Sequence, residues 1–313
     1  MRIPPFVAAV ASLALACIAS LALAADPPGS QENARLAFKA DDKGDFVFDT
    51  GVVKGRVQRD GASDTLKPVT YIEPNVPIET GHGLLIPYRF LTPQKRYGFG
   101  SWEWPHTGRL LDDGGIELRW EQAADRPFAF SATYRWKAAD TLDMTVAFTP
   151  EVDLEKFELF VGSYFRGFTK AKVYVRDGVD GKPGFVESTK DKGEMQLYPM
   201  NEAALAIVQD GRWKFPPYPN NWAIRPALAG RLGMKQEPKS GVTVLIMAPR
   251  EDCFAMSASQ QEAPLGAFYL SLFGKDVKQG QTLIGRARMV FGKDLTDEQA
   301  VQAYRTYFQD LAP

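Results

Sequence analysis

The sequence predicts an all-β protein, a large antiparallel β-sandwich that ends in a helix. Apolar and polar residues alternate with a period of two along most of the chain, which is the pattern of half-buried strands. These runs recur at intervals of roughly ten to fifteen residues, with Gly, Pro, Asp and Asn between them and no helical pattern intervening. The 20 Phe, 11 Tyr and 6 Trp also fit a β-rich protein.

Composition places the chain among ordinary globular proteins. Of 313 residues, 45% are hydrophobic and 24% are charged, and 37 Lys and Arg nearly balance 38 Asp and Glu. Nucleic-acid binders carry a basic patch or a strong positive charge, and this sequence has neither. We therefore exclude nucleic acid as a partner.

The first element of the chain has the features of a secretory signal peptide. Met1-Arg2 is followed by an uncharged apolar stretch over 3–23 that ends in Ala22-Leu23-Ala24. We expect residues 1–24 to be removed and the protein to be periplasmic or secreted. An uncleaved membrane anchor is the alternative, because about 20 apolar residues can span a bilayer. No second such stretch follows, so we expect no membrane span after cleavage.

The remaining chain divides into a flexible leader over 25–36 and a single β-sandwich domain over 37–313, with a division near residue 200 as the alternative. Two runs form a hairpin pattern around Lys137-Ala-Ala-Asp140, and Leu110-Leu-Asp-Asp-Gly-Gly supplies another tight turn. The predicted strands are 116–120, 128–136, 141–148, 157–165, 172–176, 205–209, 242–247, 267–273 and 282–291.

The last element is a helix over 296–311. Thr296-Asp-Glu-Gln299 is a capping box, in which the side chains of the first and fourth residues satisfy free backbone N–H groups. Val301, Tyr304, Phe308 and Leu311 then share one face, which predicts a helix packed on the outside of the sandwich.

Several kinds of chemistry have no motif here. The sequence lacks the glycine-rich nucleotide loops, Gly-x-Ser-x-Gly and His-Glu-x-x-His. With only His82 and His106, a site of three histidines cannot form. We therefore predict no cofactor and no metal. Cys17 lies in the signal peptide, which leaves Cys253 as a single thiol, expected to be buried and structural.

One segment, 79–109, is dense in chemically useful side chains. Flat aromatic faces stack on the apolar face of a pyranose, while cationic and acid–base groups bond its hydroxyls or move a proton. The candidates for proton transfer are His82 and His106. The candidates for sugar binding are Arg89, Arg96, Trp102 and Trp104. The structural alternatives are a turn at His82, and core packing for the tryptophans, which share one face if this segment is a strand.

A second aromatic segment is the proline-rich run 210–225, which is typical of the rim of a binding cleft. We expect Trp222 and Arg225 to contribute from it, although a rigid loop closing one end of the sandwich is an equal alternative. Tyr164 ends a long apolar strand and is a further candidate for substrate binding.

The runs 83–89, 130–136, 141–150 and 157–165 resemble the galactose mutarotase-like proteins, a superfamily of β-supersandwich carbohydrate-binding proteins. The chain is also similar to secreted bacterial proteins of unassigned function, of a kind found in planctomycetes. The resemblance implies a supersandwich that binds a mono- or oligosaccharide. The histidine motif of the mutarotases has no counterpart here, and the late Glu251 and Glu262 lack a recognisable context.

Polysaccharide lyases on related sandwiches use a Tyr or His base beside a cation. This resemblance adds Tyr88 to the catalytic candidates, with Arg89 as the cation. The sequence thus leads to a secreted carbohydrate-binding protein that acts on sugars by proton transfer, as an epimerase or a lyase. The alternatives are a non-catalytic sugar-binding protein and a structural β-sandwich of the cell envelope.

Overall fold

The computed structural model describes residues 35–263 and 266–311, together with Met1. The predicted signal peptide 1–24 and nearly all of the leader 25–36 lie outside the described residues. Within the described ranges, no helix is both long and apolar enough to cross a bilayer.

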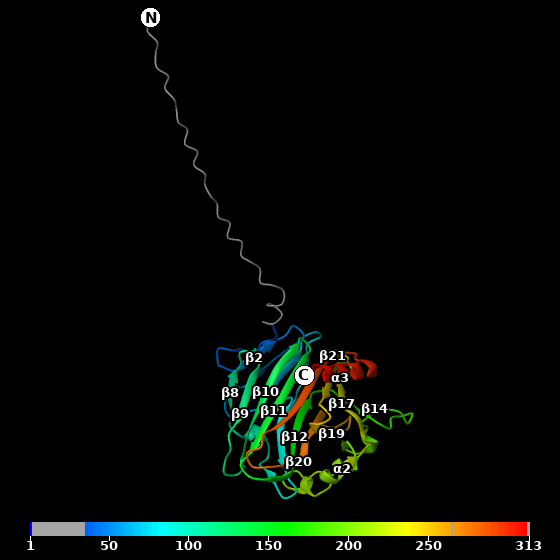
Figure 1. The fold of residues 1–313 in the computed structure, drawn as a ribbon. Coiled ribbons are helices and arrows are strands. Elements are labelled where there is room, and N and C mark those ends of the chain that lie inside the picture. The colour runs from blue at the N-terminus through cyan, green and yellow to red at the C-terminus, as the bar shows by residue number, and fades with distance from the viewer. Residues whose placement is uncertain (2–34, 264–265, 312–313) are drawn as a thin grey trace.

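The strands of the described residues form three sheets, in which the pairing is mainly antiparallel (Figure 1). The nine-stranded sheet has the order β14 (Gly184–Glu187), β13 (Lys170–Val175), β17 (Leu228–Gln236), β18 (Val242–Met247), β21 (Leu283–Lys293), β11 (Thr141–Pro150), β10 (Phe128–Ala138), β9 (Ile116–Trp120) and β8 (Thr107–Leu110). The seven-stranded sheet has the order β16 (Ala223–Ile224), β15 (Met195–Pro199), β19 (Cys253–Ser259), β20 (Gly266–Val277), β12 (Leu154–Phe165), β6 (Ile86–Leu91) and β7 (Arg96–Tyr97).

A smaller five-stranded sheet precedes them in the chain. Its strands are β1 (Lys39–Ala40), β2 (Phe46–Asp49), β3 (Val53–Val57), β4 (Leu66–Tyr71) and β5 (Val76–Pro77). All pairings between strands are antiparallel except that of β15 with β16. The helical elements are η1 (Ser101–Glu103), η2 (Lys190–Lys192), α2 (Glu202–Val208), η3 (Arg212–Lys214) and α3 (Asp297–Leu311).

The main core lies between the two large sheets. Alternate residues of β11 are buried, as the sequence pattern predicts, and Phe148 from this strand stacks on Phe157 of β12 with ring centroids 4.0 Å apart. The five-stranded sheet adds its own phenylalanines to the same core, with Phe48 5.0 Å from Trp136 of β10. The predicted all-β sandwich with a C-terminal helix is therefore confirmed.

The C-terminal helix covers the outer face of the nine-stranded sheet. Gln299 donates its backbone N–H to the Thr296 hydroxyl, and Thr296 donates its N–H to the Gln299 side chain, so the capping box forms as predicted. The Tyr304 hydroxyl accepts a hydrogen bond of 2.7 Å from the Arg231 N–H of β17. Figure 1 shows α3 beside β17 and α2 close to β19.

The predicted strand at 205–209 is wrong, because most of this run belongs to α2. The Asn201 side chain accepts a hydrogen bond from the Ala204 N–H and caps the helix. Strand-like alternation over five residues cannot be told from one side of a short helix. This correction matters for the site, because α2 and η3 cover part of the outer face of the seven-stranded sheet.

Candidate functional site

The candidate site lies on the outer face of the seven-stranded sheet, the face turned away from the main core. Side chains of β6, β12 and β20 form a second apolar cluster there, together with residues of α2, η3 and the loop that follows η3. The two aromatic segments singled out in the sequence meet on this face. Phe99 and Tyr218, one from each segment, have ring centroids 5.6 Å apart.

A β-bulge aims two polar side chains of β6 at this face. Arg89 pairs with Phe160 of β12, but the next paired residue of β6 is Pro87, so Tyr88 is the additional residue. A bulge interrupts the alternation of a strand and lets neighbouring residues face the same side. The Arg89 guanidinium donates a hydrogen bond of 3.0 Å to the Tyr88 hydroxyl.

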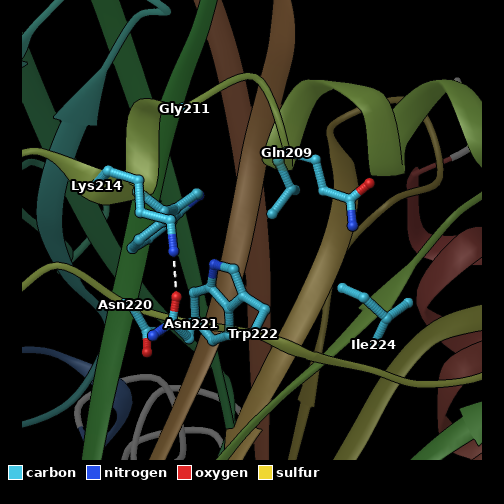
Figure 2. Close-up of a pocket in the computed structure, with 9 residues that line it drawn as sticks. Gln209, Gly211, Lys214, Asn220, Asn221, Trp222 and Ile224 are labelled. Carbon is cyan, nitrogen blue, oxygen red and sulfur yellow. Dashed lines mark hydrogen bonds between the residues drawn. The ribbon is translucent and has the colours of Figure 1, made fainter.

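Two adjoining hollows lie over this face, and Trp213, Asn220 and Trp222 line both of them. The larger has a volume of about 460 Å³, within the usual range of small-molecule sites. Figure 2 shows its lining, with Trp222 between the hydrogen-bonded pair Lys214 and Asn221 on one side and Ile224 on the other. The smaller has a volume of about 160 Å³.

The smaller hollow is aromatic and cationic. It is lined by Tyr88, Arg89, Phe160, Met195, Trp213, Tyr218, Pro219, Asn220, Trp222 and Tyr269. Arg89 is 8% exposed and its guanidinium carbon lies 5.1 Å from the centroid of the Trp213 ring. Tyr218 is the most exposed of these lining aromatic residues, at 68%. Among the described residues, none that lines either hollow is acidic.

Arg96 connects the two aromatic segments through hydrogen bonds. Its guanidinium donates to the backbone carbonyls of Gly98 and Phe99, and also to that of Pro217 in the proline-rich loop. Burial, and after it the positive charge of Arg89, lower the pKa of Arg96. Arg96 is therefore structural in its contacts, and it adds positive charge beside the smaller hollow.

Trp102 lies between two of the predicted catalytic residues. Its ring stacks on His82 at 4.1 Å and on Tyr88 at 4.5 Å between centroids. The His82 Nδ1 atom is 3.1 Å from an Asp64 oxygen. Partial burial acts to raise the pKa of Asp64, but hydrogen bonds from His82 and Lys67 outweigh it and lower the pKa. His82 itself is partly exposed and carries its second ring nitrogen free of protein partners within the described ranges.

Tyr164 belongs to the same aromatic face. Its ring packs edge-on against Tyr269 at 5.8 Å and against His82 at 5.4 Å. Burial, reinforced by the neighbouring tyrosines, raises the pKa of the Tyr164 hydroxyl well above its usual value, so it remains protonated at neutral pH. Gly162 lies between Tyr164 and Tyr269, where a Cβ atom would touch both rings.

Arg225 directly follows β16, an edge strand of the seven-stranded sheet. Its guanidinium donates to the Gln196 side chain and packs 5.6 Å from the Tyr198 ring. It lines neither hollow. Trp222, by contrast, lines both and packs against Trp213 with centroids 4.9 Å apart.

Two predicted site residues lie elsewhere. His106 is 3% exposed, bonds the Gln58 carbonyl through Nε2 and packs 5.0 Å from Trp120 in the main core. Burial lowers its pKa, which keeps the ring neutral. Trp104 is 5% exposed and packs on Phe90, also in the main core. Neither can meet a ligand at the hollows.

The reason for this separation is local. Residues 101–103 form the 3-10 helix η1, and Trp104 follows it as the C-cap. The expectation that Trp102 and Trp104 share one face of a strand is therefore wrong. The turn sends Trp102 to the outer face and Trp104 inward.

Sequence reasoning missed several residues of the hollows. Trp213, Tyr218, Asn220 and Asn221 lie in the proline-rich run, which did carry a signal, although only two of its residues were singled out. Tyr269 carried none, because it reads as one of many apolar residues within a strand. Its position on the outer face follows from the pairing of Tyr269 with Gly162.

Cys253 is buried, as predicted. Burial raises the pKa of its thiol to about 12, which makes it inert at neutral pH. In the described ranges, no group of three or more His, Cys, Asp or Glu side chains lies close enough to hold a metal ion.

Comparisons with known proteins show a similarity of fold to solved structures. No family model and no curated protein matches the sequence. Among solved structures, α-N-acetylgalactosaminidase NagBb from Bifidobacterium bifidum, in complex with GalNAc, is similar at a TM-score of 0.55 and 10% identity. The match covers 85% of this chain and 39% of that one, so the chain spans well under half of that enzyme.

Two shorter proteins are similar over nearly their whole length. A galactose mutarotase related enzyme from Lactobacillus acidophilus matches with 10% identity and a TM-score of 0.49, over 81% of this chain and 99% of that one. The Slr1438 protein from Synechocystis matches with 10% identity and a TM-score of 0.48, over 79% and 94%. The comparisons give no support to the planctomycete resemblance. The similarity shows that this chain shares its β-sandwich fold with the matched part of α-N-acetylgalactosaminidase NagBb.

Proposed function

We propose that the protein binds a carbohydrate in the two adjoining hollows on the outer face of the seven-stranded sheet. The observation that carries this proposal is the composition of the lining. Trp213, Trp222 and Tyr218 supply aromatic faces, and Gln209, Asn220, Asn221 and Lys214 supply hydrogen-bonding groups around them. A pyranose, with an apolar face and a rim of hydroxyls, matches such a surface.

The test is a thermal-shift and calorimetric screen of the protein against neutral sugars, uronates and oligosaccharides. A ligand at 100 times its dissociation constant stabilises the folded state by about 2.7 kcal/mol, which is readily detected. We expect Trp222→Ala to abolish this stabilisation and Trp222→Phe to retain part of it. Trp136→Phe is the matched control, because Trp136 lies in the main core.

A panel without a ligand would overturn the proposal and favour the structural role in the cell envelope. A ligand whose affinity is unchanged by Trp222→Ala would also contradict it, because binding would then occur elsewhere.

A second candidate function is proton transfer on the bound sugar, as in an epimerase or a lyase. The contact between His82 and Asp64 favours it, since a carboxylate on Nδ1 fixes the imidazole tautomer and leaves Nε2 to exchange a proton. Tyr88 is the alternative group for proton transfer, and Arg89, which donates a hydrogen bond to its hydroxyl, is the neighbouring cation.

Catalysis is tested on whichever sugars bind. Polarimetry follows mutarotation, and ultraviolet absorbance follows the unsaturated product of a lyase. We expect His82→Gln to lower turnover more than it lowers affinity, and Asp64→Asn to do so to a smaller extent. Binding without turnover in the wild-type protein would reject this candidate and leave a non-catalytic carbohydrate-binding protein.

We also propose that the protein is exported to the periplasm or beyond. This rests on the charged start, apolar middle and Ala-x-Ala end of residues 1–24. Expression of the full chain followed by fractionation and N-terminal sequencing tests it. A mature protein that begins at Ala25 is expected, whereas an intact Met1 in the membrane fraction would indicate an anchor.

A further inference from the structure

A buried arginine without a carboxylate partner faces the smaller hollow. Arg89 is 8% exposed, and none of the ion pairs among the described residues includes it. The buried Arg212, which precedes Trp213 in the chain, is by contrast held by both Glu158 and Asp210. Buried charges are ordinarily paired, because removing them from water is costly.

The hydrogen bonds of Arg89 are also incomplete. Its Nη2 atom donates to the Tyr88 hydroxyl at 3.0 Å, and its Nη1 atom has a long contact of 3.4 Å with the Tyr218 carbonyl. Its Nε atom is buried and has no partner in the described part of the chain. A guanidinium has five N–H donors, and these two bonds leave three of them without a partner in the described part of the chain.

The charged side chains that line the two hollows, Arg89 and Lys214 among the described residues, are both cationic. Arg96 lies close enough for its charge to interact with that of Arg89, and Lys214 lines the larger hollow. In the part of the chain that the structure describes, neither hollow has an acidic residue in its lining. Glu158, a buried carboxylate on this face, is already bonded to Arg212.

We propose that the ligand carries an anionic substituent, of which a sugar carboxylate is the best match, and that Arg89 binds it in the smaller hollow. This inference rests on the proposed carbohydrate-binding function and adds the class of sugar. The guanidinium fork matches a planar carboxylate with two parallel hydrogen bonds. A volume of about 160 Å³ equals that of about five waters, enough for a carboxylate and its linking carbon. The sugar ring then lies in the larger hollow against Trp222.

The first experiment uses the wild-type protein and three ligands of one shape: galacturonate, its uncharged methyl ester and galactose. Calorimetry at low salt should give an affinity for galacturonate about tenfold or more above those of the two neutral sugars. Equal affinities for the acid and its ester would overturn the proposal, whatever the behaviour of any variant. Galactose 6-sulfate, bound more tightly than galacturonate, would indicate a sulfated sugar as the source of the anion and would correct the assignment of a carboxylate.

The second experiment assigns the preference to Arg89. Arg89→Gln should lose the preference for the charged sugar, so that it binds galacturonate and galactose with equal affinity, and Arg89→Lys should keep part of the preference. Arg135→Gln is the matched control, because Arg135 lies on the other large sheet and is exposed. An unchanged preference in a folded Arg89→Gln would overturn the role of Arg89.

The two proposals fail in different ways. Binding of galactose and galacturonate with equal affinity leaves the carbohydrate site in place and rejects the anionic substituent. Failure of every sugar to bind rejects the carbohydrate site, and this inference fails with it.

Discussion

The guanidinium of Arg212 and the carboxylate of Glu158 form an ion pair of 3.2 Å in which neither side chain is exposed to solvent. The pair joins η3 to β12, and a second bond of 2.8 Å joins Arg212 to Asp210. Because Trp213 follows Arg212 directly, this pair fixes one of the two tryptophans that line both hollows. The ion pair therefore positions the candidate site without lining it.

Removing one member of this pair should destabilise the protein. Arg212→Met leaves the Glu158 charge buried without its partner, and such a change typically costs about 3–5 kcal/mol in the free energy of unfolding. Urea denaturation measures it. Lys278→Met is the control and should leave the midpoint unchanged, because the ion pair of Lys278 with Asp153 is exposed. The double variant Arg212→Met with Glu158→Met should recover much of the loss, and its failure to do so would show that packing of Arg212 dominates.

Because of Lys235, the protein should become more stable as the pH rises above neutrality. Its side chain is fully buried between the sheets, and no acceptor bonds its amine in the described ranges. Burial lowers the pKa of Lys235 from 10.5 to about 7. Between these two values the unfolded chain holds a proton that the folded protein does not. Stability therefore rises as the pH increases from about 7 toward 10.

The measurement is the melting temperature at pH 6, 7, 8 and 9 for the wild-type protein and Lys235→Met. The difference between the two proteins should be largest at pH 6, in favour of the variant, and should shrink as the pH rises. Parallel curves would show that the amine has an ordinary pKa in the folded protein.

Acrylamide quenching should separate the tryptophans into two classes. Trp102 and Trp222 are partly exposed, whereas the other four are 6% exposed or less. We expect Trp102→Phe and Trp222→Phe each to remove part of the quenchable emission, and Trp104→Phe to remove none. A bound sugar should protect Trp222 and leave Trp102 accessible. Equal quenching before and after Trp222→Phe would contradict the position of that ring.

Gly233 should not tolerate a side chain. A Cβ atom at this position of β17 would lie 2.0 Å from the Phe268 ring of β20, across the sandwich. Gly233→Ala is therefore expected to lower the free energy of unfolding by about 1–3 kcal/mol through overpacking. Gly184→Ala on the edge strand β14 is the control, since its nearest neighbour atom would be 3.7 Å away. An equal effect of both substitutions would indicate that backbone entropy alone is responsible.

Much of the fold could be predicted because its signals are local. The hairpin of β10 and β11 pairs Phe130 with Phe148, and alternation places both rings in the core. The capping box at Thr296 and Gln299 fixes the start of α3 through bonds only three residues apart. In contrast, the run 205–209 was too short for its period to distinguish a strand from a helix.

The candidate site depended on pairings that no local pattern records. His82 and His106 lie in one dense segment of the sequence, yet His82 stacks on Trp102 at the outer face and His106 packs on Trp120 in the main core. The bulge that turns Tyr88 and Arg89 to the same face exists only in the register of β6 against β12.

By itself, the sequence determined the all-β class, the hairpins and the C-terminal helix, because alternation, turn residues and caps act over a few neighbouring residues. Only the tertiary structure decided which aromatic and charged side chains meet, because strand register sends each side chain to one face or the other. Long-range packing then placed Trp222 and Tyr218 opposite Arg89, more than a hundred residues away in the chain.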